Sequence, residues 1–181
     1  MFNSLLAIVL LGTTPTFTPS EASFIEVMRE RCPTGGKIVT PEFLRALLDA
    51  ETKAGIPEYA RGISIVAACR ESGFNPHPKH GDGGKAVGLL QWWPWWEDAY
   101  RFNRETQPLV GVFATMHHVT TLAKKVRRHC GKVKRPFFYA YTWVTSGPKG
   151  HKCRHNRHVR TLLHWKWRSR LAMRATSADG P

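Results

Sequence analysis

Glu71 is the residue whose type and position point most directly to chemistry. Ile63, Val66 and Ala67 recur before it at helical spacing, so a carboxylate stands where the apolar stripe of a helix would continue. Gly73 is a typical helix C-cap and places Glu71 in the last turn, at the negative end of the helix dipole. We expect partial burial and the dipole to raise the pKa of its carboxyl group, as a general acid requires. The alternative is a solvated glutamate paired with a neighbouring base.

The residues around Glu71 belong to a longer pattern. From Gly62 the chain reads GISIVAACRESGFNP; a glycine-containing loop follows, and then AVGLLQ, which ends at Gln91. Ala140 and Tyr141 form a third element. The order and spacing resemble the soluble lytic transglycosylase family, in which an apolar helix ends in ESGFNP and a GLMQ segment follows after a loop. The domain of that family has a lysozyme-like fold related to goose-type lysozyme.

The resemblance extends over roughly residues 56–147 and implies an activity. Family members cleave the β-1,4 bond between N-acetylmuramic acid and N-acetylglucosamine in peptidoglycan and leave 1,6-anhydro ends. One carboxylate suffices because the N-acetyl group of the substrate can stabilise the developing positive charge in place of a second carboxylate. The resemblance implies that Glu71 is the catalytic acid and later the base, and that the Tyr141 hydroxyl orients it. Thr142 stands where the family has asparagine, which leaves the role of Thr142 open.

Glycan binding is expected close to these motifs. The resemblance implies that the residue after Glu71 and the turn that leads into Gln91 hold the sugar. Two tryptophans follow Gln91 directly; aromatic faces suit the apolar faces of sugar rings, although some members of such a run also fill the core. The expected substrate-binding residues are Ser72, Gly88, Leu89, Gln91, Trp92 and Trp93.

Other functions stay open on the sequence alone. Asp82, in the glycine-containing loop, is the best second carboxylate for a hydrolytic muramidase that leaves reducing ends, with Glu97 and Asp98 behind it. Asp-Gly sequences also favour plain turns. A basic module without catalysis would bind an envelope polymer or nucleic acid, and a toxin-like protein would disrupt membranes with its tail. No recognised nucleic-acid motif is present, so nucleic acid is not the expected partner.

Net charge divides the chain into two parts. The 181 residues contain 27 Lys and Arg against 13 Asp and Glu, a formal net charge of +14. Residues 1–120 hold 11 basic and 12 acidic residues, whereas residues 121–181 hold 16 basic residues and one acid, Asp179. With 42% hydrophobic residues, the chain is not a disordered basic tail. The excess predicts a polyanionic partner, and we expect a monomer that binds the peptidoglycan glycan strand and an anionic envelope polymer or membrane surface.

The N-terminal segment predicts export. Residues 5–11 form an apolar run that is too short to span a bilayer, and the small residues Ser20 and Ala22 suit signal-peptide cleavage after Ala22. We therefore expect a protein of the periplasm or cell envelope, or alternatively a secreted or phage-associated one.

The cysteines agree with export. Four cysteines allow three pairings, with one or two disulfides in an oxidising compartment. A zinc site is the other interpretation, but the spacings match no closed zinc pattern, and we expect no metal and no other cofactor. The cysteines are Cys32, Cys69, Cys130 and Cys153, and the zinc site would combine the last two with His129, His151, His155 and His158.

A helical scaffold must position these residues. The chain has no convincing strand pattern, and Thr40 followed by Pro41 is a typical helix start. Predicted helices cover residues 23–31, 41–55, 58–72, 95–102, 108–129, 135–144 and 155–170. We expect a mainly α single domain with the lysozyme-like fold that the resemblance implies. It would consist of a signal peptide (1–22), the catalytic domain (23–150) and a basic C-terminal helix and tail (151–181).

Overall fold

Helices make up nearly all of the regular structure. The computed structural model describes residues 14–32, 39–75, 80–145 and 153–178. Within these ranges there are seven α-helices and no sheet, which confirms the mainly helical single domain. The helices are α1 (Pro19–Arg31), α2 (Pro41–Lys53), α3 (Ile63–Ser72), α4 (Trp95–Tyr100), α5 (Pro108–Cys130), α6 (Pro136–Thr145) and α7 (Arg157–Ala178).

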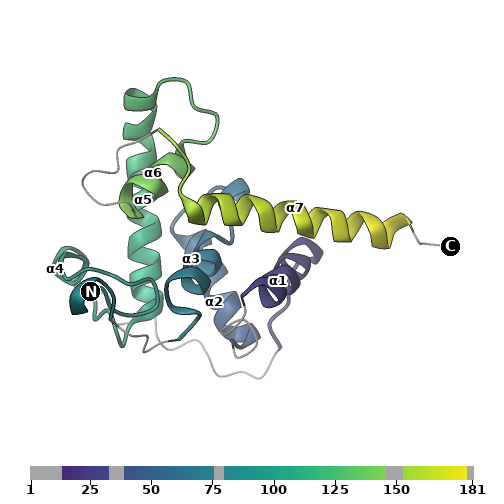
Figure 1. Cartoon of the computed structure of the whole chain (residues 1–181), viewed down its shortest axis with the longest axis horizontal. Helices are drawn as coiled ribbons and strands as arrows, with labels where there is room; N and C mark the ends of the chain where they lie inside the picture. Colours follow the sequence, from purple (N-terminus) through teal and green to yellow (C-terminus); the bar gives the residue numbers. More distant parts are fainter. Residues whose placement is uncertain (1–13, 33–38, 76–79, 146–152, 179–181) are drawn as a thin grey trace.

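α3 is held by two neighbouring helices and carries Glu71. It packs against both α2 and α7; α7 also lies along α1, and α5 packs against α2 and α6 (Figure 1). Fully buried side chains from four helices meet in one core, among them Leu44, Ile65, Phe137 and Leu162. The C-terminal part of α7 extends beyond the body of the molecule (Figure 1).

The first half of α7 is part of the packed domain. Val159, Leu162 and Trp165 are at most 3% exposed, so one face of the helix is buried. The hydroxyl of Ser23 on α1 donates a hydrogen bond to the carbonyl oxygen of Ser169 on α7 (3.1 Å). The predicted division at residue 150 therefore does not separate a domain from an appended tail, because α7 completes the core.

α1 begins before the predicted cleavage site. Thr18 and Glu21 form a capping box, in which each side chain accepts a hydrogen bond from the backbone N–H of the other residue. Glu21 also pairs with Arg45 (2.9 Å) and Arg61 (3.1 Å). Cleavage at the predicted site would remove these contacts together with the first turn of α1. The apolar run of the predicted signal peptide, residues 5–11, lies outside the described residues.

The predicted helix over residues 58–72 is divided at Gly62. A 3-10 turn covers Glu58–Ala60, and α3 starts only after Gly62. Gly62 has a φ of 89°, and a Cβ atom there would lie 2.7 Å from the ring of Phe24 on α1. Both the positive φ and this close approach require glycine, and the positive φ interrupts the helix. The other predicted helix ends agree within two residues, apart from the start of α1 and the end of α7.

Glu51 on α2 caps the start of α3 from inside the core. Its side chain is 0% exposed and accepts hydrogen bonds from the N–H of Gly62 (2.6 Å), the N–H of Ser64 (2.7 Å) and the hydroxyl of Ser64 (2.6 Å). The two backbone donors are helix N-terminal groups that have no partner within the helix. Burial raises the pKa of Glu51, and the bonds from Ser64 and Gly62 oppose this shift. A buried carboxylate thus fixes where α3 begins.

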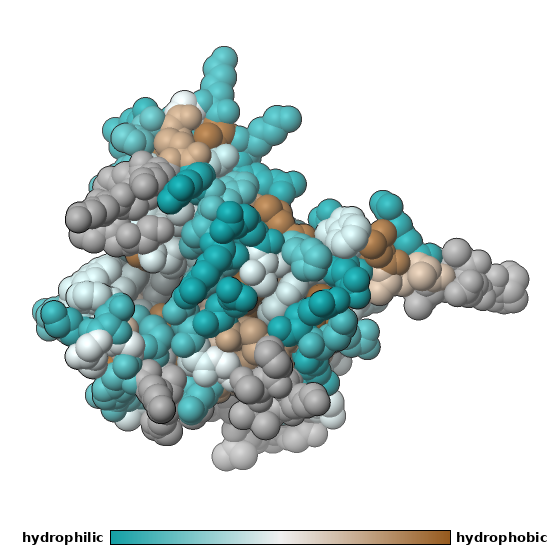
Figure 2. Space-filling model, viewed as in Figure 1, coloured by the Kyte–Doolittle hydropathy of each residue, from teal (hydrophilic) through white to brown (hydrophobic). Residues whose placement is uncertain are grey.

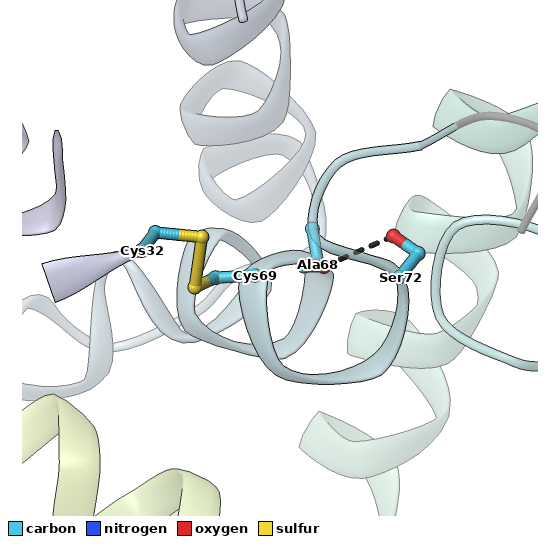
Figure 3. The surroundings of a disulfide bond; sticks show 4 residues. All are labelled: Cys32, Ala68, Cys69 and Ser72. Atoms are coloured by element: carbon cyan, nitrogen blue, oxygen red, sulfur yellow. Dashed lines mark hydrogen bonds between the residues drawn. A yellow bond between two sulfur atoms is a disulfide. The ribbon is translucent and has the colours of Figure 1, made fainter. Parts of the chain in front are cut away.

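Two disulfides join segments that are distant in sequence. Cys32, directly after α1, is bonded to Cys69 in α3 (Figure 3), and Cys130 at the end of α5 is bonded to Cys153. This selects one of the three possible pairings and uses both thiols that the zinc site would need. Disulfides are typical of proteins outside the cytoplasm. Among the helices of the described segments, none combines the length and the apolarity of a membrane span.

We predict that Glu51→Gln lowers the free energy of unfolding by about 2–3 kcal/mol, the upper part of the range for leaving a buried N–H donor without a partner. Glutamine keeps one acceptor oxygen, but its amide group would face an N–H donor of α3. Urea unfolding at neutral pH, followed by circular dichroism, measures the loss. Glu42→Gln is an exposed change in the first turn of the same helix and should cost less than about 1 kcal/mol, the limit for an exposed charge near a helix N-terminus. Equal effects of the two substitutions would contradict the capping role.

Candidate active site around Glu71

Glu71 lies in the last turn of α3, as the sequence predicts. Gly73 follows in the left-handed conformation (φ 62°). The N–H groups of Gly73 and Phe74 close the helix on the carbonyl oxygens of Cys69 and Ala68. The side chain of Glu71 is 23% exposed, which confirms the expected partial burial and leaves the carboxylate within reach of a ligand.

Ser72 is adjacent to Glu71, but its hydroxyl is engaged within the helix. It donates a hydrogen bond to the carbonyl oxygen of Ala68, one turn earlier (3.0 Å; Figure 3). The hydroxyl oxygen can still accept a hydrogen bond. The predicted contact of Ser72 with a glycan would therefore use Ser72 as an acceptor.

Two basic side chains from the start of α7 contact the Glu71 carboxylate. Its Oε1 accepts a hydrogen bond from Nη2 of Arg157 (3.0 Å) and lies 2.7 Å from Nε2 of His158. The His158 contact has the distance of an ion pair without the angles of a well-aligned hydrogen bond. The side chain of His158 is 4% exposed, and that of Arg157 is 57% exposed. One partner is thus fixed in the core, whereas the other lies at the surface.

The expectation that the pKa of Glu71 is raised is wrong for this arrangement. Burial raises the pKa of Glu71. The hydrogen bonds and charge interactions with His158 and Arg157 together lower it by a larger amount, so the pKa lies below its ordinary value. The local sequence could show only the burial and the helix dipole. Arg157 lies 86 residues away in the chain, and with its neighbour it reverses the direction of the shift. In this state Glu71 is a carboxylate at neutral pH.

Tyr141 reaches Glu71 through His158, which corrects the expected direct contact. The Tyr141 hydroxyl lies 3.1 Å from Nδ1 of His158, whose other ring nitrogen faces Glu71. Tyr141 is 1% exposed, and burial, together with the charges of Glu71 and Glu51, raises its pKa, so the hydroxyl stays protonated. In a neutral His158 ring, the hydrogen then sits on Nε2 and the hydroxyl donates to Nδ1. The three side chains form the chain Tyr141–His158–Glu71.

Thr142 fixes the start of α7, which gives a role to the residue that departs from the family pattern. It is 3% exposed; its hydroxyl donates to the carbonyl oxygen of Phe138 (2.9 Å) and accepts from the backbone N–H of Asn156 (3.1 Å). The Asn156 side chain in turn accepts from the N–H of Val159 (2.9 Å) and caps α7. α6 therefore holds the turn of α7 that contacts Glu71.

Gln91 and Gly88 stabilise the loop that follows α3. Oε1 of Gln91 accepts from the N–H of Gly81 (3.0 Å), and Nε2 donates to the carbonyl oxygen of Gly88 (3.2 Å). Gly88 has a φ of 76°, and a Cβ atom there would overlap the carbonyl oxygen of Arg104. Because these polar groups already bond one another, a glycan would have to compete for them.

The remaining predicted binding residues differ in exposure. Leu89 and Trp92 are 1% and 2% exposed, and the Trp92 ring N–H donates to the hydroxyl of Thr115 (2.9 Å). Their side chains belong to the core and do not face a ligand. Trp93 is 42% exposed, and its ring N–H donates to the carboxylate of Asp82 (3.2 Å). Of the two tryptophans, Trp93 is the one that can meet a sugar.

Arg157 and His158 are the site residues that the sequence interpretation missed. Both lie beyond residues 56–147, and the sequence suggests only the role of a zinc ligand for His158. A carboxylate at a helix C-terminus calls for a cationic partner, but this signal does not say where in the chain the partner lies. Figure 2 shows hydrophilic side chains gathered over the middle of the face on which, in Figure 1, α3 meets the start of α7.

We predict a pH-dependent effect of Glu71→Gln on stability. Because the folded protein lowers the pKa of Glu71, the carboxylate stabilises the fold above its unfolded pKa of about 4.3, and this contribution disappears as the pH falls through the folded value. The difference in unfolding free energy between wild type and variant should therefore be more favourable to wild type at pH 7 than at about pH 3. Urea unfolding at a series of pH values measures it. Glu26→Gln, an exposed change on α1, serves as the control; a pH-independent difference for Glu71→Gln would contradict the ion pairing.

Comparison with known proteins identifies no relative of this chain. No family model, curated protein or solved structure matches it.

Proposed function

We propose that the protein is a peptidoglycan lytic transglycosylase of lysozyme-like fold that cleaves the β-1,4 bond between N-acetylmuramic acid and N-acetylglucosamine, with Glu71 as its acid and base. The observation that carries the proposal is the state of Glu71. It lies in the last turn of a buried helix and is partly exposed. The buried His158 contacts its carboxylate and is itself hydrogen-bonded to the buried Tyr141. An ordinary surface glutamate needs no such support, whereas a catalytic carboxylate must be oriented to within a fraction of an ångström.

The reaction divides between two states of Glu71. The protonated carboxyl group gives its proton to the glycosidic oxygen while the C1–O4 bond breaks, and the N-acetyl group of the substrate stabilises the positive charge at C1. The muramyl C6 hydroxyl then attacks C1, and the Glu71 carboxylate takes up the hydroxyl proton. No water is consumed, and Glu71 ends protonated, as it began. The contact with His158 keeps Oε1 in place throughout both steps.

Hydrolysis with a second carboxylate fits the contacts less well. The Asp82 carboxylate accepts a hydrogen bond from Trp93, and Glu97 forms an ion pair with Arg104 (2.8 Å). Both carboxylates therefore have partners that account for their positions. These contacts favour the single-carboxylate reaction, in which an enzymatic nucleophile is not needed.

The outward face of α7 supplies a second contact with the substrate. This helix carries six Lys and Arg and no acid. Arg160, His164, Trp167, Leu171 and Arg174 follow one another at helical spacing and form a stripe opposite the buried face. Trp167 is 54% exposed and Leu171 is 42% exposed. Guanidinium groups pair with carboxylates and tryptophan stacks on sugars, so an acidic glycan such as peptidoglycan suits the stripe better than a neutral polymer does.

We predict that Glu71→Gln lowers the release of soluble muropeptides from purified peptidoglycan by at least about 1,000-fold, because glutamine cannot donate or accept the catalytic proton. Mass spectrometry of the wild-type products should show anhydro ends. Glu26→Gln on α1 should leave the rate unchanged. Unchanged release by Glu71→Gln would refute the proposed function, and reducing ends would favour a hydrolase.

We also predict that Arg160→Gln combined with Arg174→Gln weakens binding to peptidoglycan sacculi by about tenfold, the scale of two exposed ion pairs. The substitutions are made in the Glu71→Gln background so that the sacculi stay intact, and binding is measured by co-sedimentation at several salt concentrations. Arg127→Gln with Arg128→Gln, an exposed pair on α5, removes the same charge elsewhere. Equal losses for both pairs would mean that net charge, and not the α7 stripe, governs binding.

A further inference from the structure

We propose that Arg157 is exchanged between Glu71 and the substrate: a carboxylate carried by the glycan takes the guanidinium from Glu71, and this exchange frees Glu71 to act as an acid. The inference rests on the proposed function and adds to it a residue that determines specificity, Arg157, which would favour strands that bear a carboxylate next to the cleaved bond.

The two partners of Glu71 are unequal in a way that favours exchange. His158 is 4% exposed, is bonded to Tyr141 and belongs to the packed part of α7, so it cannot leave without unpacking the helix. Arg157 is 57% exposed and contacts Glu71 through one nitrogen only. Exposed ion pairs contribute little stability, because water and salt compete with them. Arg157 can therefore leave Glu71 at a small cost in free energy.

A substrate carboxylate is a stronger partner for Arg157 than Glu71 is. The guanidinium group binds a carboxylate best through two parallel N–H···O bonds, whereas Glu71 offers it one oxygen that it shares with His158. A lactyl or peptide carboxylate that arrives in a water-excluding complex can take both bonds. The exchange then replaces a single contact by a paired one.

The exchange also resolves a conflict in the resting site. Acid catalysis needs a protonated Glu71, but the contacts with His158 and Arg157 lower its pKa and keep it ionised. The other groups that bear on the carboxylate are Tyr141, through His158, and the exposed Arg70 beside Glu71 on α3. Once Arg157 has left, only His158 still lowers the pKa of Glu71, so the opposing effect of burial raises the pKa above its resting value. The carboxylate can then take a proton before the glycosidic bond breaks.

Substrate preference is the first test. The substrates are muramyl glycan strands, which carry lactyl carboxylates, and N-acetylglucosamine oligomers of the same length, which carry none. Wild type should cleave the muramyl strands with a kcat/KM at least about fivefold higher, the scale of one exposed ion pair. Arg157→Gln should reduce this preference to near unity, by losing rate on the charged strands and gaining rate on the uncharged ones. Arg154→Gln, an exposed change just before α7, should keep the wild-type preference.

A direct titration is the second test and does not depend on turnover. Carbon-13 NMR of the Glu71 carboxyl group should show a higher pKa in Arg157→Gln than in wild type. Saturating N-acetylmuramic acid should raise the pKa of Glu71 in wild type, and N-acetylglucosamine should not. An unchanged pKa with N-acetylmuramic acid would overturn the exchange.

The two proposals fail in different ways. Full activity of Glu71→Gln would refute the proposed function itself. An inactive Glu71→Gln combined with an unchanged substrate preference in Arg157→Gln would refute only the exchange. Equal losses on both substrates in Arg157→Gln would likewise refute it, since they would show Arg157 to be a structural partner of Glu71.

Discussion

The contact between Glu71 at the end of α3 and His158 at the start of α7 is the constraint on which the site depends. A carboxylate in the last turn of a helix faces the negative end of the helix dipole, and a partly buried one also loses hydration. Basic groups of α7 offset both costs at 2.7 and 3.0 Å. α7 holds them there because its apolar face packs on α1 and α3. The C-terminal helix is therefore a structural component of the site, although it lies outside the motifs that first pointed to Glu71.

The two carboxylates at the ends of α3 show how position decides the use of one chemical group. Glu51 lies at the N-terminus of the helix, where backbone N–H groups donate to it, although full burial raises its pKa. Its role is to fix the start of the helix. Glu71 lies at the opposite end, where the dipole opposes its charge and solvent reaches its side chain. Only the second environment can change with a ligand, because surface groups such as Arg157 can leave it.

The sequence predicts those features of the structure that depend on residues close together in the chain. The C-cap at Gly73, the N-cap at Thr40 and most helix ends depend on neighbouring residues and were predicted. The direction of the Glu71 pKa shift was not, because it depends on α7. The sequence predicts that Gln91 and Gly88 bind the glycan. The loop itself already requires these residue types, because Gln91 bonds to the carbonyl oxygen of Gly88 and Gly88 has a positive φ. A motif records which residues a site retains, but it does not separate those that touch the ligand from those that shape the backbone.

We propose two separate uses for the basic C-terminal charge, because one continuous helix, α7, carries both the partner of Glu71 and the outward stripe. From composition alone, the 16 Lys and Arg after residue 120 predict a single polyanion-binding region. In the structure, Arg157 faces Glu71, whereas Arg160 and Arg174 belong to the outward stripe. Arg157 lies three residues before Arg160 and seven before His164, so it continues the side of the helix that carries the stripe into the first turn. A strand bound along the stripe would raise the local concentration of carboxylates near Arg157. A single helix can thus both bind the glycan and free Glu71, because Arg160 and Arg174 would bind the glycan while Arg157 leaves Glu71.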